Sequence, residues 1–188
     1  MKIGLFIPCF MNELYPEASM ATLQVLENLG LDVEYPLEQT CCGQAQANTG
    51  CASETKVLAE RFLRIFKDYD YVVAPSGSCV SMVRNHYAQF LDGEEGFERM
   101  KTHTYELVEF LLEVMKVDTF KVKFPHKVGI HNSCHSHRGI GMASMSERNV
   151  PEFSKLKTIL SKVEGISFAE LSRKDECCGF GGTFAVSE

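Results

Sequence analysis

The sequence contains two copies of a cysteine pattern that is able to bind a metal centre. Cys41-Cys42-Gly43 returns as Cys177-Cys178-Gly179, and a single cysteine precedes each copy, Cys9 before the first and Cys134 before the second. Two adjacent thiolates reach one centre only where the backbone turns sharply, and the glycine that follows them permits such a turn. A disulfide between neighbouring cysteines would strain the peptide that joins them, so we interpret each pair as two ligands.

Each single cysteine follows a short apolar run of the kind that forms a β-strand, residues 3–7 before Cys9 and residues 128–131 before Cys134. An apolar stripe with helical spacing then separates each single cysteine from its triplet. Each half therefore predicts a strand, a cysteine, a helix and a triplet, and a repeat of this length indicates two duplicated lobes rather than a solenoid. We predict an α/β fold of two pseudo-symmetric Rossmann-like lobes with short parallel sheets, at residues 1–96 and 97–188.

The second lobe is expected to be truncated. After Gly43 the first lobe continues through a predicted helix from Ser53 to residue 66 and a strand at 71–74 to Cys79, whereas only nine residues follow Gly179. The most linker-like stretch, residues 92–96, separates the lobes. Further helices are predicted at residues 107–115 and from Pro151, and a further strand at 166–171.

The expected order of strands places the first cysteines at one edge of a sheet. A strand at 3–7, a helix that begins at Pro16 and a strand at 31–35 predict a right-handed crossover. Ligands of such sheets bind beside the carboxyl ends of the strands, where we expect Cys9 and Cys41. Cys79 follows a Pro-Ser-Gly-Ser turn before a helix predicted at 81–90, and a helix N-terminus stabilises a thiolate.

Composition excludes several classes of function. The chain has 188 residues with 45% hydrophobic content, enough for a core, and its net charge of -6 without a basic run argues against nucleic acid as a partner. No apolar stretch approaches the roughly 20 residues that span a bilayer. The first residues lead straight into a strand and do not resemble a signal peptide. Eight cysteines in such a chain indicate metal binding or catalysis rather than disulfides, so we expect a cytoplasmic protein.

These motifs resemble the CCG-domain family of cysteine-rich iron–sulfur proteins, to which a subunit of heterodisulfide reductase also belongs. The family pattern is a cysteine, a spacer, Cys-Cys-Gly, a second spacer and Cys-x-x-Cys, usually in two copies. Its lactate-utilisation branch is most similar to the strings Pro75-Ser76-Gly77-Ser78-Cys79, His131-Asn132-Ser133-Cys134-His135 and Cys177-Cys178-Gly179-Phe180-Gly181-Gly182-Thr183-Phe184. The resemblance covers essentially the whole chain.

The resemblance implies a [4Fe–4S] cluster and an electron-transfer role. Carried over residue by residue, the first site is Cys9, Cys41, Cys42 and Cys79, and the second is Cys134, Cys177 and Cys178. Met82 stands where the family has its last cysteine, which puts the five-ligand, non-cubane cluster in doubt, although four thiolates hold an ordinary cluster. The implied role is that of an electron-transfer subunit in a complex that oxidises L-lactate or another 2-hydroxy acid, with iron–sulfur and flavin proteins as partners.

Two other functions fit the same cysteines. A thiol–disulfide oxidoreductase similar to heterodisulfide reductase would use the same cysteines on a substrate disulfide. A scaffold subunit would instead hold zinc, because four thiolates suit zinc as well as they suit iron.

The remaining residues able to bind a metal have simpler explanations. Cys51 has no partner in the repeat and is interpreted as an ordinary thiol. His131, His135 and His137 flank Cys134, and His135 and His137 are expected on one side of an extended segment, in capping or surface positions. Arg138 is either a surface residue or a counter-charge for an anionic cluster or a carboxylate.

Overall fold

The computed structural model describes residues 1–172, 174 and 176–179, and the chain divides into two compact units. The first unit spans Met1–Leu107 and the second spans Val108–Gly179. Both contain short parallel sheets between helices, so the predicted α/β class is confirmed. The prediction of lobes at residues 1–96 and 97–188 concerns domains with a common fold and stays a prediction.

The first unit is built on a sheet of four parallel strands. Their order is β2-β1-β3-β4, and the strands are β1 (Lys2–Leu5), β2 (Asp32–Glu34), β3 (Tyr71–Ala74) and β4 (Thr104–Glu106). The inner strands β1 and β3 are apolar and almost fully buried, as is usual for a parallel sheet covered on both faces. Strand β4 was missed in the sequence, because its residues Thr-Tyr-Glu carry no apolar run.

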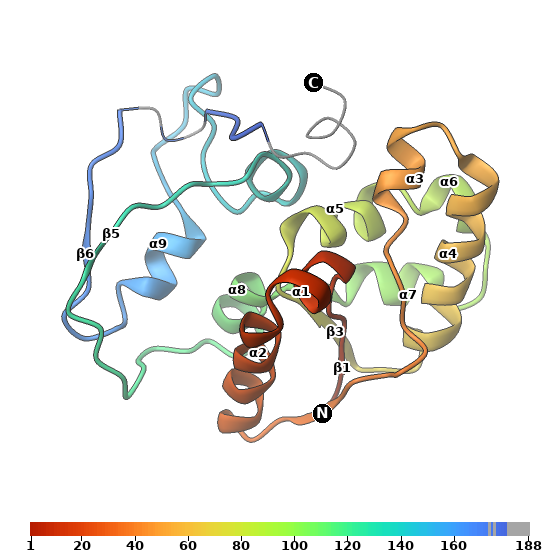
Figure 1. Cartoon of the computed structure of the whole chain (residues 1–188), viewed down its shortest axis with the longest axis horizontal. Coiled ribbons are helices and arrows are strands. Elements are labelled where there is room, and N and C mark those ends of the chain that lie inside the picture. Colours follow the sequence, from red (N-terminus) through yellow and green to blue (C-terminus); the bar gives the residue numbers. More distant parts are fainter. Residues whose placement is uncertain (173, 175, 180–188) are drawn as a thin grey trace. The chain divides into compact units, whose positions relative to one another are not determined.

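Helices cover both faces of this sheet. Helix α2 lies on one side of β1 and β3, and α4, α6 and α7 lie on the other (Figure 1). The connection from β1 to β2 runs in one direction along the sheet, and those from β2 to β3 and from β3 to β4 run in the other. Right-handed crossovers that run in opposite directions place their helices on opposite faces of the sheet. The helices are α1 (Cys9–Leu14), α2 (Pro16–Asn28), α3 (Gln44–Asn48), α4 (Ala52–Phe66), α5 (Gly77–Asn85), α6 (Ala88–Leu91) and α7 (Phe97–Thr102).

Two predicted helices in this unit have different boundaries in the structure. Helix α4 begins at Ala52, because Cys51 rather than Ser53 occupies its N-cap. The helix predicted at 81–90 starts earlier, at Gly77, because the Ser76 side chain accepts a hydrogen bond from the Cys79 N–H and caps it. It ends at Asn85 and is followed by the separate short helix α6.

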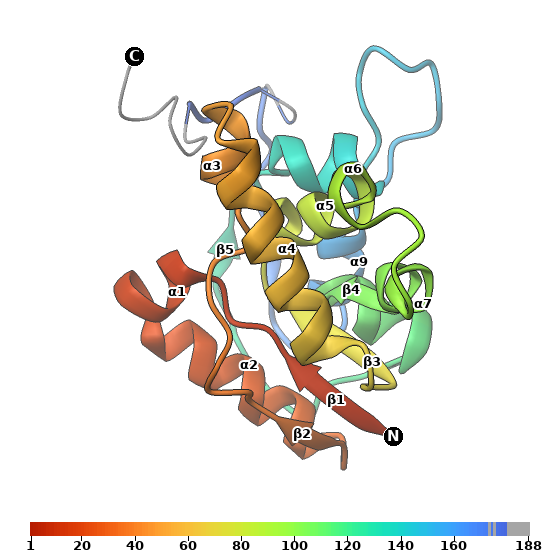
Figure 2. The same cartoon turned by 90° about the vertical axis from the view of Figure 1, so that its right-hand side faces the viewer.

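An aromatic cluster fills the core between β1 and α4. Helix α4 lies in front of the sheet in Figure 2. The Phe6 and Phe62 rings meet edge to face with centroids 4.9 Å apart, and Phe66 lies 4.6 Å from Phe62. The Tyr87 ring contacts Phe62 at 5.6 Å and is fully buried. Edge-to-face pairs of this kind add about 0.5–1.5 kcal/mol beyond the burial of area.

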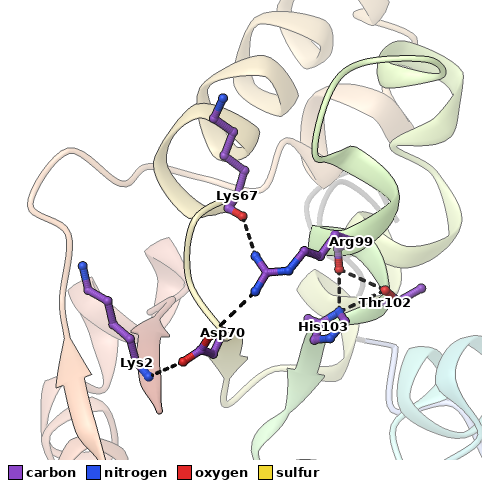
Figure 3. Close-up of polar contacts among 6 residues, drawn as sticks. All are labelled: Lys2, Lys67, Asp70, Arg99, Thr102 and His103. Atoms are coloured by element: carbon purple, nitrogen blue, oxygen red, sulfur yellow. Dashed lines mark hydrogen bonds and ion pairs between the residues drawn. The ribbon is translucent and has the colours of Figure 1, made fainter.

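A polar cluster joins the elements at the amino end of the sheet (Figure 3). The Asp70 carboxylate accepts a hydrogen bond from the Lys2 backbone N–H at 2.8 Å and lies 3.7 Å from the Arg99 guanidinium, which also donates to the Lys67 carbonyl at 3.0 Å. The Arg99 carbonyl in turn lies 2.8 Å from His103 Nδ1. These contacts tie α7 to the start of β1 and β3, so they hold the edge opposite the one where the strands end.

The second unit has less regular structure than the sequence predicted. Its elements are α8 (Leu107–Glu109), which begins at the last residue of the first unit, the π-helices η1 (Phe110–Val114) and η2 (His135–Gly139), helix α9 (Lys155–Leu160) and the parallel strands β5 (Lys127–Val128) and β6 (Ser167–Phe168). The single α-helix predicted at 107–115 is therefore wrong, because it turns into a π-helix at Phe110. The strands at 128–131 and 166–171 shrink to two residues each.

Helix α9 begins at Lys155 and not at the predicted Pro151. Phe153 pairs with Ser144 through backbone and side-chain hydrogen bonds, and this pairing keeps the chain extended up to Ser154. The Ser154 hydroxyl then caps the helix by accepting from the Lys157 N–H. Within the helices that the structure describes, none is long and apolar enough to cross a membrane.

Strand β1 permits no side chain at Gly4, and this gives a stability prediction. A Cβ at Gly4 would lie 2.9 Å from both Phe66 and Tyr69 ring atoms, so Gly4→Ala forces the core apart and is expected to cost about 1–3 kcal/mol of unfolding free energy, measured by urea denaturation. Gly129→Ala is the control, because its Cβ would meet only Leu171 at an ordinary 3.7 Å. Equal stability of the two variants would contradict this packing.

Candidate metal centre

Three segments bring four cysteines of the first unit to the carboxyl edge of its sheet. Cys9 opens α1 just after β1, Cys41 and Cys42 lie between β2 and α3, and Cys79 lies in the first turn of α5 just after β3. Because the three strands are parallel and adjacent, their carboxyl ends meet at one edge. The sequence predicted this placement for Cys9 and Cys41, and the position of Cys79 at a helix N-terminus is confirmed.

The four thiols interact in one connected series. Cys9 interacts with Cys41, Cys41 with Cys42, and Cys42 with Cys79. Burial increases along the series, since Cys9 is exposed, Cys41 is partly buried, and Cys42 and Cys79 are buried. The structure therefore brings together all four residues predicted for the first site.

Protons are shared unequally along this series. Interactions with Cys42 and then with Cys9 hold the pKa of Cys41 far below its usual range, and the interaction with Cys42 lowers the pKa of Cys79. The bond to Cys41 raises the pKa of Cys9, and bonds to Cys41 and Cys79 together with burial raise the pKa of Cys42. These directions make Cys41 and Cys79 the more acidic cysteines of the four.

Neighbouring groups favour negative charge on Cys41 and Cys79. The Gly43 N–H donates to Cys41 Sγ at 3.4 Å, and the Ser76 hydroxyl also lowers the pKa of Cys79. Gly43 has φ +81°, the left-handed conformation that glycine adopts without strain, so the predicted sharp turn after the cysteine pair is present. Such hydrogen bonds to sulfur are typical of sites that hold anionic metal–thiolate centres.

Gln39 connects two of the cysteine-bearing segments. Its side-chain amide accepts a hydrogen bond from the Ile7 N–H at 2.8 Å and donates to the Leu5 carbonyl at 3.0 Å. The side chain therefore pairs with the end of β1 as a neighbouring strand would. It fixes the loop that carries Cys41 against the segment that carries Cys9, and no sequence pattern had indicated this role.

The donor set fits a metal–thiolate centre, but the sulfurs do not already surround a single ion. Among residues 1–172, 174 and 176–179, no three His, Cys, Asp or Glu side chains are arranged to hold one metal ion. Four thiols from three neighbouring segments nevertheless supply the number and type of ligands that a [4Fe–4S] cluster or a zinc ion requires.

The cysteines of the second triplet have the same local geometry. The Gly179 N–H donates to Cys177 Sγ at 3.4 Å, and Gly179 has φ +77°. Burial raises the pKa of Cys134, and its interactions with Cys177 and with the charge of Cys178 raise it further. The three predicted ligands of the second site therefore interact, although Cys177 and Cys178 are both exposed. Residues 180–184 of the string that resembled the lactate-utilisation branch lie outside the described residues.

The remaining candidate residues have structural contacts. Cys51 is exposed at the N-cap of α4, where it accepts a hydrogen bond from the Thr49 hydroxyl at 3.6 Å. The prediction that His135 and His137 lie along an extended segment was wrong, because both belong to the π-helix η2. His137 is buried with Nδ1 2.9 Å from the Ser133 carbonyl, and His131 Nε2 lies 2.8 Å from the Glu176 carbonyl.

Arg138 pairs with Glu147 on the surface of the second unit. Its charge also reaches Cys134, where it lowers the pKa of the thiol against the larger effects of burial and Cys177. These contacts are those of a surface residue, and a role as counter-charge for a cluster or a carboxylate stays a prediction.

A prediction follows for the Gln39 connection. Gln39→Met keeps the length of the side chain but removes both hydrogen bonds to β1, each of which contributes about 0.5–1.5 kcal/mol. We expect a loss of about 1–3 kcal/mol in unfolding free energy by urea denaturation and faster alkylation of the buried Cys42. Gln24→Met, on the exposed face of α2, is the control. Unchanged stability in Gln39→Met would contradict the role of this side chain.

Comparison with known proteins agrees with this arrangement. The model of the CCG cysteine-rich domain matches residues 3–84 and 128–188. The chain is 36% identical to lactate utilization protein A 2 of Bacillus cereus strain Q1 over 190 aligned positions. The alignment covers 99% of this chain and 74% of that protein. It is 38% identical to lactate utilization protein A of Exiguobacterium sp., over 98% of this chain and 74% of the relative.

Proposed function

Because the chain belongs to the cysteine-rich CCG domain family and is a relative of lactate utilization protein A, we propose that it is an iron–sulfur protein that carries electrons during lactate oxidation. The observation that carries this proposal is the connected series of four sulfurs in the first unit. Packing alone gives no reason to gather four ionisable thiols from three separate segments, since like charges at close range are costly.

In this proposal Cys9, Cys41, Cys42 and Cys79 hold a [4Fe–4S] cluster. Four thiolates are sufficient for such a cluster, which supplies reversible one-electron transfer when bound. The chain's own contribution is to orient and stabilise the sulfurs, through the Gly43 N–H on Cys41 and the Ser76 hydroxyl on Cys79. Met82 is buried and provides no fifth thiolate, which favours the cubane over the non-cubane form.

The two sides of the site have different roles in this proposal. Cys42 and Cys79 are buried and anchor the centre, whereas Cys9 is exposed and marks the side from which a redox partner approaches. We assign the chemistry on the 2-hydroxy acid to partner subunits with flavin or further iron–sulfur groups, because hydride or electron removal from such an acid requires a cofactor of that kind.

The proposal extends to the second site and to the compartment. Cys134, Cys177 and Cys178 supply three ligands, two of them exposed, so we expect this site to bind its metal more weakly than the first. All eight cysteines are free thiols, the state maintained by the reducing cytoplasm, where we place the protein.

Metal analysis of paired serine variants tests the function. In protein made anaerobically with ample iron, we expect Cys41→Ser to lower bound iron and sulfide by about four ions each per chain, since one cluster is lost. The electron paramagnetic resonance signal of the reduced first cluster should disappear with them. Cys51→Ser is the matched control and should keep both, because Cys51 is an exposed thiol outside the series.

Two results would contradict this function. Stoichiometric zinc without iron under the same conditions would favour a zinc-stabilised scaffold. Equal iron loss in Cys41→Ser and Cys51→Ser would remove the first site from consideration as a specific centre.

A further inference from the structure

Tyr87 links the two segments that carry the buried cysteines Cys42 and Cys79. Its side chain is fully buried, and its hydroxyl donates a hydrogen bond to the Cys42 carbonyl at 2.9 Å. Tyr87 itself lies just after α5, the helix whose first turn carries Cys79. One hydroxyl group therefore links the end of the helix that bears Cys79 to the backbone of Cys42.

The ring of Tyr87 is held firmly, so the position of its hydroxyl is fixed. The ring meets Phe62 edge to face at 5.6 Å, within the aromatic cluster of Phe6, Phe62 and Phe66. Its backbone N–H donates to the Met82 carbonyl at 3.2 Å, and its carbonyl accepts from Leu91 at 2.9 Å. Both the ring and the backbone are thus anchored in the core.

The carbonyl that Tyr87 binds belongs to the peptide group whose N–H reaches Cys41. The peptide between Cys42 and Gly43 is planar and trans, so its C=O and its N–H point in opposite directions. On one side the Cys42 carbonyl accepts from Tyr87, and on the other the Gly43 N–H donates to Cys41 Sγ at 3.4 Å. Rotation of this peptide would lengthen both bonds together.

We propose that Tyr87 is a positioning residue that, by holding the peptide between Cys42 and Gly43, keeps the Gly43 N–H directed at Cys41 Sγ. The hydroxyl touches no sulfur in this role. It acts through one peptide plane, and it also fixes the backbone of Cys42 relative to the helix that carries Cys79.

The consequence for electron transfer rests on the proposed function. Hydrogen bonds to ligand sulfurs stabilise the more negative, reduced state of an iron–sulfur cluster and raise its reduction potential. If Cys41 is a cluster ligand, Tyr87 therefore raises the potential of the first cluster through the Gly43 N–H.

The first test measures the Gly43 amide without any metal. Amide hydrogen exchange is followed by nuclear magnetic resonance in the reduced, metal-free, full-length chain, for wild type, Tyr87→Phe and Tyr69→Phe. Tyr69 is the matched control, because its hydroxyl donates to Glu34 on the exposed side of the first unit. We expect exchange at Gly43 to become about fivefold faster or more in Tyr87→Phe alone, as befits the loss of one hydrogen bond.

The Val72 amide reports on the stability of the sheet in the same spectra, since it donates to the His103 carbonyl. Equal acceleration at Gly43 and Val72 would mean that Tyr87→Phe loosens the whole unit, and would overturn the proposal. Unchanged exchange at Gly43 would overturn it as well. If Tyr87→Phe does not fold, the wild-type chain still decides, because a Gly43 amide that exchanges freely in it would exclude the held peptide.

The second test measures the reduction potential of the cluster in anaerobically prepared protein. We expect a lower potential in Tyr87→Phe than in wild type and Tyr69→Phe, and an unchanged potential would overturn the tuning role. If the wild-type chain binds no iron at all, the proposed function fails. The exchange measurement would still decide the positioning role of Tyr87, so the two failures are distinguishable.

Discussion

Parallel pairing of β1, β2 and β3 is the constraint on which the candidate centre depends. Cys9, Cys41 and Cys79 are far apart in the sequence, and they meet because each follows the carboxyl end of one of three adjacent strands. Antiparallel pairing would send one of these segments to the opposite edge. The polar contacts of Asp70 and Arg99 at the amino edge and the aromatic cluster beneath Tyr87 stabilise this sheet from other sides.

The same geometry creates an electrostatic problem that the local structure resolves. Neighbouring thiolates repel one another, so the pKa values of Cys9 and Cys42 are raised while those of Cys41 and Cys79 are lowered. Backbone and hydroxyl donors then stabilise the two negative positions, Cys41 and Cys79. A cationic metal centre would relieve the remaining repulsion, which is the physical reason to expect that these thiols bind one.

The sequence was sufficient to predict the cysteines of the site and the strands that position them. Short apolar runs identified β1, β2 and β3, and the duplicated triplet identified both sets of sulfurs, whose glycines share the same turn. Gln39 and Tyr87 could not be predicted in this way. Each acts on a backbone group distant in the sequence, and that contact exists only after the tertiary fold has formed. The π-helix η1 was predicted as an α-helix because its apolar spacing is also that of an α-helix, whereas the polar segment of η2 has no such spacing and was predicted as extended.

The electron-transfer role requires that sulfurs from three segments of the first unit share a single iron–sulfur centre. Iron anomalous scattering from crystals of the anaerobically prepared protein tests this claim directly. We predict an iron peak bonded to the sulfurs of Cys9, Cys41, Cys42 and Cys79. Iron bound elsewhere, or these four sulfurs joined to no common centre in an iron-loaded crystal, would contradict the account.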